Sequence, residues 1–219
     1  MDYISPLDDD TLPGIERRRD VTPQELLEEY VMKSRPVVLT DTVKDWPAMK
    51  KWTPQYFKER YGAIKHEVKG KVYTIAEQVE LMMHSTMEHP APYPYNLNVD
   101  HVFPELREDM RPPTVFDRVD RLLSPMMPKL LAKGTIKHEL FLSGKGSYFP
   151  ILHVDVQHLH TQITQVYGSK VFFLYAPDQT PYMYPKPEVP LYSAVDNIFK
   201  PDLEKYPLFA KAKCHKQIL

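Results

Sequence analysis

The stretch Ile151-Leu152-His153-Val154-Asp155 carries the clearest chemical pattern in this chain of 219 residues. In a β-strand, side chains two residues apart point to the same face, so His153 and Asp155 would lie together while Val154 faces away. A neutral imidazole beside a carboxylate provides two of the three protein ligands of a facial metal site. The tripeptide also occurs often by chance, and by itself it more often marks an ordinary surface pair.

A second informative segment follows downstream, where Lys170 opens the strongly apolar strand expected over 170–176. A lysine at this position either extends its charged end to solvent at a sheet edge or points inward to bind an anion. A barrel that holds a metal and a dicarboxylate would need one such cation for the distal carboxylate. Considered alone, the edge lysine is the slightly simpler interpretation.

Composition and charge argue against several classes of protein. With 28 Lys and Arg against 29 Asp and Glu, the formal charge is −1, which disfavours binding of nucleic acid through bulk electrostatics. No apolar run approaches the roughly 20 residues of a membrane helix, and the acidic residues 1–10 do not resemble a signal peptide. The single cysteine, Cys214, excludes an internal disulfide framework and a cysteine-rich zinc site. We therefore expect a reducing intracellular compartment, cytoplasmic or nuclear.

The order of the predicted elements indicates an α+β chain. Helix-start signals concentrate in the first half and β-like segments in the second, which suggests an antiparallel β-core with an N-terminal helical layer. The 22 prolines limit long helices, and the 14 tyrosines and 9 phenylalanines suit a β-rich core. Three expected helices begin near Thr22, Thr53 and Thr74, with Gly62 as the C-terminal cap of the second, and a further helix is expected over 202–212. The expected strands cover 138–143, 150–156, 159–166, 170–176 and 214–219.

The order and spacing of the motifs resemble those of a known family. His153-x-Asp155 is followed by Gln165-x-x-Gly168-x-Lys170 and then by Leu174-x-x-Pro177. This run is similar to the cupin-like JmjC family of Fe(II)- and 2-oxoglutarate-dependent oxygenases. Segments 35–39, 45–48 and 52–62 are similar to the part that precedes the barrel in its small hydroxylase branch. The resemblance extends over nearly all of residues 14–219.

The resemblance implies a double-stranded β-helix, which is a jelly-roll barrel of cupin type with the metal inside. We expect a loose acidic lead-in over residues 1–13. An N-terminal α/β segment over 14–125 would pack on the barrel. The barrel itself would occupy 126–219 and would be incomplete at its C-terminal end.

The resemblance also implies the chemistry of the site. His153 and Asp155 would bind Fe(II), with 2-oxoglutarate as cosubstrate and O₂ as co-reactant. Lys170 would pair with the distal carboxylate of 2-oxoglutarate, and Tyr95 occupies the place of a tyrosine that hydrogen-bonds the same carboxylate. Tyr95 is equally well interpreted as a core aromatic residue. The implied activity is hydroxylation of a protein or another C–H substrate, which the sequence does not identify.

Several positions depart from the family pattern. Pro150 stands where many relatives carry a Thr or Ser that contacts 2-oxoglutarate, and Ser147 offers a hydroxyl nearby. In the family pattern a polar residue follows the metal-binding carboxylate. In this chain that residue is His158, His160 or Thr161, and the spacing does not distinguish them. These three side chains are equally compatible with a surface location.

The second metal histidine of the family is not recognisable. His215 is the only histidine after His160, and it lies too early in the chain, so we expect a solvent-facing side chain rather than a ligand. A fragment of a longer oxygenase, a truncated gene product and a natural short form without catalysis are all compatible with this departure. The first two are favoured because His153, Asp155 and Lys170 are retained together.

Two other classes of function compete with the oxygenase. An inactive barrel could act as an interaction module, with Tyr182 and Tyr184 of the proline-rich loop as exposed aromatic residues. Ordinary loop packing is the simpler interpretation of both tyrosines. A cupin that binds a small molecule without iron would show no dependence on metal.

Overall fold

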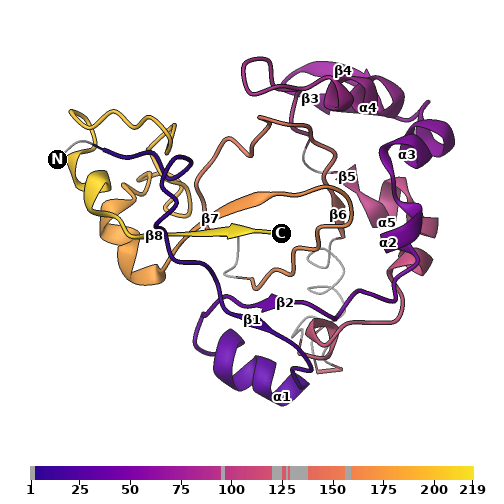
Figure 1. Cartoon of the computed structure of the whole chain (residues 1–219), viewed down its shortest axis with the longest axis horizontal. Coiled ribbons are helices and arrows are strands. Elements are labelled where there is room, and N and C mark those ends of the chain that lie inside the picture. Colours follow the sequence, from indigo (N-terminus) through magenta and orange to yellow (C-terminus); the bar gives the residue numbers. More distant parts are fainter. Residues whose placement is uncertain (1–2, 95–96, 120–124, 127, 129–137, 156–158) are drawn as a thin grey trace. The chain divides into compact units, whose positions relative to one another are not determined.

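The structure is a computed structural model that describes residues 3–94, 97–119, 125–126, 128, 138–155 and 159–219. The chain divides into two compact units (Figure 1). The split unit combines Met1–Thr40 with Pro150–Leu219, and the continuous unit is Asp41–Phe149. The boundaries expected from the sequence, at 13/14 and 125/126, stay predictions.

The N-terminal part of the split unit is a short helix beside a parallel strand pair. Thr22 caps the helix, since its hydroxyl accepts the N–H of Glu25 at 3.1 Å, and proline occupies the first helical position. Leu26 and Tyr30 form the buried face of this helix. The elements are β1 (Arg17–Arg18), paired with β2 (Val38–Leu39), and α1 (Pro23–Glu25), continued by the π-helical η1 (Leu26–Val31).

The C-terminal part of the split unit contains its longest strands. β7 (Val171–Tyr175) and β8 (Cys214–Ile218) lie side by side and antiparallel, with Phe173 opposite Lys216 (Figure 1). Two 3₁₀ helices, η6 (Pro177–Tyr182) and η7 (Pro207–Lys211), connect them. Val195, Tyr206 and Phe209 form a buried cluster against which Tyr175 packs.

Residues 3–15, the N-terminal strap, lie against the outer edge of β8. The N–H of Lys216 donates to the carbonyl of Pro13 at 3.0 Å. The ammonium of Lys216 donates to the carbonyl of Leu7 at 2.9 Å and lies 3.1 Å from Asp10 Oδ1. The acidic lead-in that we expected to be loose is thus held by hydrogen bonds to the other end of the chain.

The continuous unit begins with capped helices and a hairpin. Thr74 and Glu77 form the expected capping box, with the N–H of Glu77 at 3.2 Å from Thr74 Oγ1 and the N–H of Thr74 at 2.7 Å from Glu77 Oε2. The helix from Thr53 ends where expected, but Gly62 has a right-handed φ of −52°. Its Cβ would lie 2.2 Å from the Lys58 carbonyl, so close packing explains the glycine. The elements are α2 (Ala48–Lys51), α3 (Pro54–Tyr61), β3 (Lys65–Val68), β4 (Lys71–Thr74) and α4 (Ile75–Met83).

The core of the continuous unit is aromatic. Phe103 meets Phe57 and Tyr61 edge to face, with the rings of Tyr61 and Phe103 4.9 Å apart. Asp109 is buried beside this cluster, where it accepts a hydrogen bond from Trp52 Nε1 at 2.9 Å. The remaining elements are β5 (Leu97–Asn98), paired with β6 (Glu139–Leu140), α5 (Val99–Val102), and the 3₁₀ helices η2 (Pro104–Met110) and η3 (Phe116–Arg118).

The described strands form four two-stranded sheets and no closed barrel. Two expected strands are wrong in the described residues: 150–156 contains a single bridge at His153, and 159–166 contains no strand. Alternating side chains are compatible with a strand, but a strand also needs a continuous ladder of partners, which the alternation does not encode. The expected helix over 202–212 is reduced to η7, since Pro207 can begin a helix but cannot continue one.

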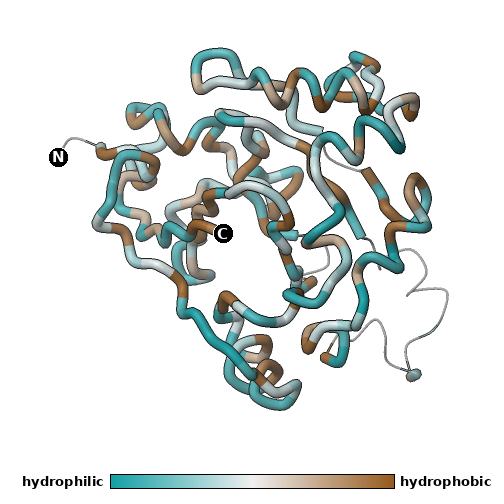
Figure 2. The backbone as a smooth tube through the Cα atoms, turned by 45° about the vertical axis from the view of Figure 1, so that its right-hand side comes forward, coloured by the Kyte–Doolittle hydropathy of each residue, from teal (hydrophilic) through white to brown (hydrophobic). Residues whose placement is uncertain are grey.

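Hydrophobic residues are distributed in short stretches along the described part of the chain (Figure 2). This distribution suits amphipathic elements that each bury one face. Within the described residues, no helix has the length and apolar character required to cross a bilayer.

Candidate metal centre

The backbone around His153 is held by a second segment of the split unit. The N–H of Val154 donates to the carbonyl of Leu191, and the N–H of Ser193 donates to that of Leu152, both at 2.9 Å. The ring of Tyr192 stands edge-on to the imidazole of His153, with centroids 6.1 Å apart. Segment 191–193 therefore fixes both the backbone and the ring of His153.

The sequence predicted that His153 and Asp155 lie together, and the structure places them in contact. His153 Nε2 lies 3.4 Å from Asp155 Oδ1. The other ring nitrogen, Nδ1, lies 2.8 Å from the carbonyl oxygen of Ile151. Because a carbonyl only accepts, this hydrogen bond places a proton on Nδ1 and directs Nε2 toward the carboxylate.

This donor arrangement fits one shared cation. Two metal–ligand bonds of about 2.1 Å at a right angle would place the donor atoms about 3.0 Å apart. The observed 3.4 Å needs a shift of a few tenths of an ångström, within reach of side-chain rotation. A hydrogen bond from the second ring nitrogen to a backbone carbonyl is also the usual support of a metal-bound histidine.

The two groups stabilise each other's charged form. The hydrogen bond from His153 lowers the pKa of the Asp155 carboxyl, and the hydroxyl of Thr161 lowers it further. The same hydrogen bond to Asp155 raises the pKa of the His153 imidazole. The side chains are 30% and 45% exposed, so a cation from solvent can reach them.

A third protein ligand is not found beside this pair. Within the part of the chain that the structure describes, no group of three or more His, Cys, Asp or Glu side chains is placed to hold a metal ion. His215 lies on β8 opposite Leu174. It is half-buried, with Nδ1 enclosed, so the expected solvent-facing side chain is wrong. A half-buried imidazole suits a position in the middle of a paired strand.

Lys170 lies directly before β7. Its backbone exchanges two hydrogen bonds of 3.0 Å with Leu219. Its side chain is half-buried, with Nζ 5.3 Å from the centre of the Phe172 ring, and burial lowers the pKa of the ammonium. The ammonium is therefore stabilised in part by the ring and has lost part of its hydration. Its expected role toward 2-oxoglutarate stays a prediction.

The other predicted positions have varied outcomes. Tyr95 and His158 lie outside the described residues, and His160 is exposed. The hydroxyl of Ser147 donates to the carbonyl of Ala91 at 2.8 Å, so it supports the backbone of the continuous unit.

Thr161 and Tyr184 acquire defined contacts. Thr161 donates its hydroxyl hydrogen bond to Asp155 Oδ2, a contact that spacing alone did not reveal. The Tyr184 hydroxyl accepts the N–H of Leu208 at 2.8 Å, and its ring packs on Tyr206. Loop packing is therefore confirmed for Tyr184.

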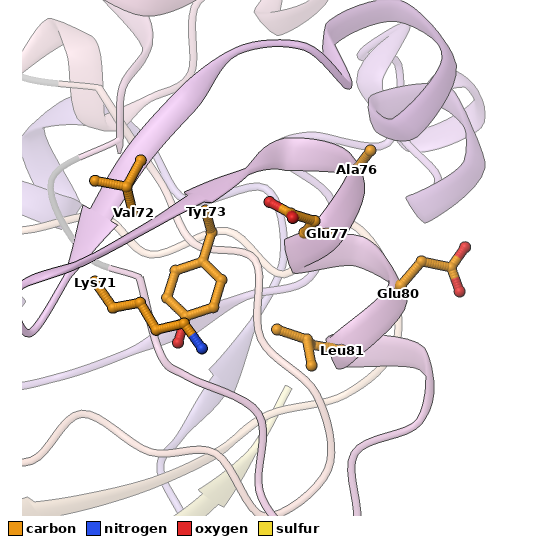
Figure 3. A pocket seen from close by; sticks show the side chains of 7 residues that line it. All are labelled: Lys71, Val72, Tyr73, Ala76, Glu77, Glu80 and Leu81. Atoms are coloured by element: carbon orange, nitrogen blue, oxygen red, sulfur yellow. The ribbon is translucent and has the colours of Figure 1, made fainter.

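An open groove of about 440 Å³ lies between β4 and α4 of the continuous unit (Figure 3). Tyr73 and Leu81 give it apolar walls, and the ammonium of Lys71 lies 5.0 Å from the centre of the Tyr73 ring. Glu77 at its rim belongs to the capping box of α4. None of the sequence-predicted site residues lines this groove.

Comparison with known proteins places this arrangement in a family. The model of the cupin-like domain matches residues 23–219, which is most of the chain. The chain therefore belongs to the cupin-like domain family. Together with its relatives, this confirms the resemblance to the JmjC type, and the family implies a jelly-roll fold.

The individual relatives are distant. Lysine-specific demethylase 8 of Xenopus tropicalis is 26% identical over 94% of this chain and 44% of its own length. tRNA wybutosine-synthesizing protein 5 of Gallus gallus is 31% identical over 67% of this chain and 39% of its own. Lysine-specific demethylase JMJ21 of Arabidopsis thaliana is 24% identical over 77% of this chain and 18% of its own. The chain thus spans less than half the length of each relative.

Proposed function

We propose that this chain provides the metal- and cosubstrate-binding part of an Fe(II)- and 2-oxoglutarate-dependent oxygenase that hydroxylates a protein or another C–H substrate. The observation that carries the proposal is the contact between His153 Nε2 and Asp155 Oδ1 at 3.4 Å. The hydrogen bond from Nδ1 to the Ile151 carbonyl supports it, because it leaves Nε2 as the metal-binding nitrogen.

His153 Nε2 and Asp155 Oδ1 would hold the iron. Iron bound with 2-oxoglutarate supplies the oxidation of a C–H bond by O₂, with 2-oxoglutarate converted to succinate and CO₂. For this role Asp155 must be ionised, and His153 must release any proton on Nε2 to solvent as the cation binds. The contribution of the protein is to fix these two groups in adjacent positions before the metal binds.

Lys170 would bind the distal carboxylate of 2-oxoglutarate. Its ammonium is half-buried, and burial lowers its pKa, so an anion beside it would offset the lost hydration. An ammonium–carboxylate pair in a partly enclosed place is a strong, charge-assisted hydrogen bond. Tyr95 is proposed as the second donor to the same carboxylate.

A protein is the proposed substrate class. Two of the relatives are named for lysine demethylation and one for wybutosine synthesis in tRNA. The formal charge of −1 gives this chain little bulk attraction for a polyanion, which favours the protein substrate.

Thermal unfolding of the full chain with Mn(II), alone and with 2-oxoglutarate, tests this proposal. Mn(II) should raise the unfolding temperature, and 2-oxoglutarate should raise it further, since a ligand at 100 times its Kd stabilises the folded state by about 2.7 kcal/mol. Lys170→Ala should retain the effect of Mn(II) and lose that of 2-oxoglutarate. The exposed Lys200 provides the matched control, Lys200→Ala, which should behave as wild type.

A wild-type chain that neither compound stabilises would contradict the proposal. Stabilisation by 2-oxoglutarate that survives Lys170→Ala would contradict the role of Lys170 while leaving the metal site in place. Dependence on 2-oxoglutarate without any dependence on metal would favour a cupin that binds a small molecule without iron.

A further inference from the structure

The two carboxylate oxygens of Asp155 have different neighbours. Oδ1 faces His153 Nε2 at 3.4 Å, and Oδ2 accepts a hydrogen bond from the hydroxyl of Thr161. We infer that Thr161 is a positioning residue of the metal site, whose hydroxyl occupies Oδ2 and leaves Oδ1 as the single oxygen for the cation. This inference rests on the proposed function and adds to it a residue and the mode of carboxylate binding.

The number of carboxylate oxygens on the metal determines how many positions remain open. A carboxylate binds a cation through one oxygen or through both. In the facial site of the family, which has a second histidine that is not found among the described residues of this chain, three positions remain for cosubstrate and O₂ when the carboxylate binds through one oxygen. Binding through both oxygens would remove one of these positions. A hydrogen-bond donor on Oδ2 favours the single-oxygen mode.

The chemistry of threonine suits this role. Its hydroxyl donates a charge-assisted hydrogen bond to the ionised carboxylate. A β-branched side chain has a restricted χ1, so the position of the hydroxyl is well defined once the backbone is fixed. The donor therefore restricts the rotation of the carboxylate about its own χ2.

The surroundings of Thr161 argue against a mainly structural role. Thr161 is exposed, so its hydrogen bond competes with water and contributes little to the stability of the fold. The polar position after the metal carboxylate was expected to fall on one of three residues. The contact of Thr161 with Asp155 distinguishes it and directs its hydroxyl to the carboxylate.

Titration of the metal-free full chain with Co(II), followed by calorimetry and visible absorption, tests the inference. Thr161→Val retains the shape of the side chain and removes the hydroxyl. We expect it to weaken Co(II) binding about 10-fold, the lower end of the cost of losing an outer partner of a metal ligand, and to change the Co(II) absorption bands. Thr161→Ser restores the hydroxyl and should restore both affinity and spectrum.

Two further variants separate the possible causes. Thr164→Val is the matched control, because the hydroxyl of Thr164 accepts a hydrogen bond from Gln162 Nε2 at 3.2 Å. It should leave Co(II) binding unchanged. Asp155→Ala should abolish binding and thus shows that Co(II) occupies the proposed site. Should Thr161→Val fail to fold, Thr161→Ala removes the same hydroxyl with a smaller side chain.

The outcomes distinguish a failure of the inference about Thr161 from a failure of the proposed function. Wild-type affinity and spectrum in Thr161→Val, with binding lost in Asp155→Ala, would overturn the role of Thr161 and leave the metal site intact. Equal binding by wild type and Asp155→Ala, or no binding by either, would overturn the proposed site and with it the inference. Weakened binding in both Thr161→Val and Thr164→Val would indicate a general structural effect and would also overturn the inference.

Discussion

Two histidine–aspartate pairs in this protein use the same side chains in opposite orientations. In the split unit, His153 turns Nε2 toward Asp155 and bonds its Nδ1 to a backbone carbonyl. In the continuous unit, His138 turns Nδ1 toward Asp100, at 3.2 Å from Oδ2. The guanidinium of Arg107 lies 3.3 Å from the other oxygen of Asp100.

The difference separates the pair proposed to bind metal from a structural pair. The carboxylate of Asp100 already pairs with a guanidinium that cannot lose its proton, and a metal ion would have to displace it. The carboxylate of Asp155 pairs with an imidazole that can release its Nε2 proton to solvent when a metal binds, and with a neutral hydroxyl. The neighbours of the carboxylate, rather than the residue types, therefore determine what each pair can do.

The largest expected difference between the two pairs is in metal affinity. His153→Gln should weaken Mn(II) binding by more than about 100-fold, because a direct ligand is worth more than an outer partner. His138→Gln should leave the affinity within about 2-fold of wild type, since Arg107 and Asp100 still form their ion pair. Isothermal titration calorimetry measures both constants. Equal losses in the two variants would show that the orientation of the ring does not distinguish the pairs.

In the absence of metal, we expect the Asp100 pair to contribute more to the free energy of unfolding than the Asp155 pair. Asp100→Ala should lower the free energy of unfolding by about 1–2 kcal/mol, because the side chain is 22% exposed, the ring and the N–H of His138 lose their acceptor, and Arg107 loses its ion pair. Asp155→Ala should cost less than about 1 kcal/mol, since Asp155 is 45% exposed and solvent screens the interaction. Urea unfolding of the metal-free chain measures both values. A larger loss in Asp155→Ala would contradict the structural assignment of the Asp100 pair.

A third histidine, His66, extends the comparison to an imidazole without a carboxylate. The expected quantity is the change in the free energy of unfolding with pH. Burial on β3 lowers the pKa of His66 below its ordinary value of 6.5. The unfolded chain therefore takes up a proton at His66 before the folded chain does, so stability falls as the pH drops below about 6.5. His66→Phe, which retains a ring beside Tyr73, should reduce this acid slope. Identical slopes from pH 7 to pH 5 in urea unfolding would contradict the assignment, and this effect should be the smallest of the three.

The elements that could be predicted from sequence are those whose information is local. The capping box of Thr74 and Glu77 is complete within four residues, and the helix begins where it was predicted to begin. β7 and β8 were also predicted correctly, because their apolar or alternating residues run without interruption. By contrast, the backbone of His153 pairs with Tyr192, a partner that no pattern near His153 specifies.

The candidate site also contains one contact that was predicted from the sequence and others that were not. His153 and Asp155 were predicted to share one face of a strand; the contact is found, but the strand is reduced to a single bridge at His153. Thr161 could not be assigned from sequence, because the described residues 159–161 form no regular strand and the face of Thr161 could not be counted by periodicity. The pairing of His138 with Asp100 across 38 residues was not predicted either, since it depends on how α5 and β6 meet.

The N-terminal strap has a consequence for the synthesis of the protein. Leu7 and the Lys216 side chain that binds it are 209 residues apart. At a translation rate of 5–20 residues per second, the strap would wait about 10–40 s at the ribosome before its binding partner exists. The continuous unit is complete long before that time and can fold first. The split unit, which carries His153 and Asp155, is therefore assembled after the continuous unit, and the nascent chain must remain soluble with residues 3–15 unpaired until then.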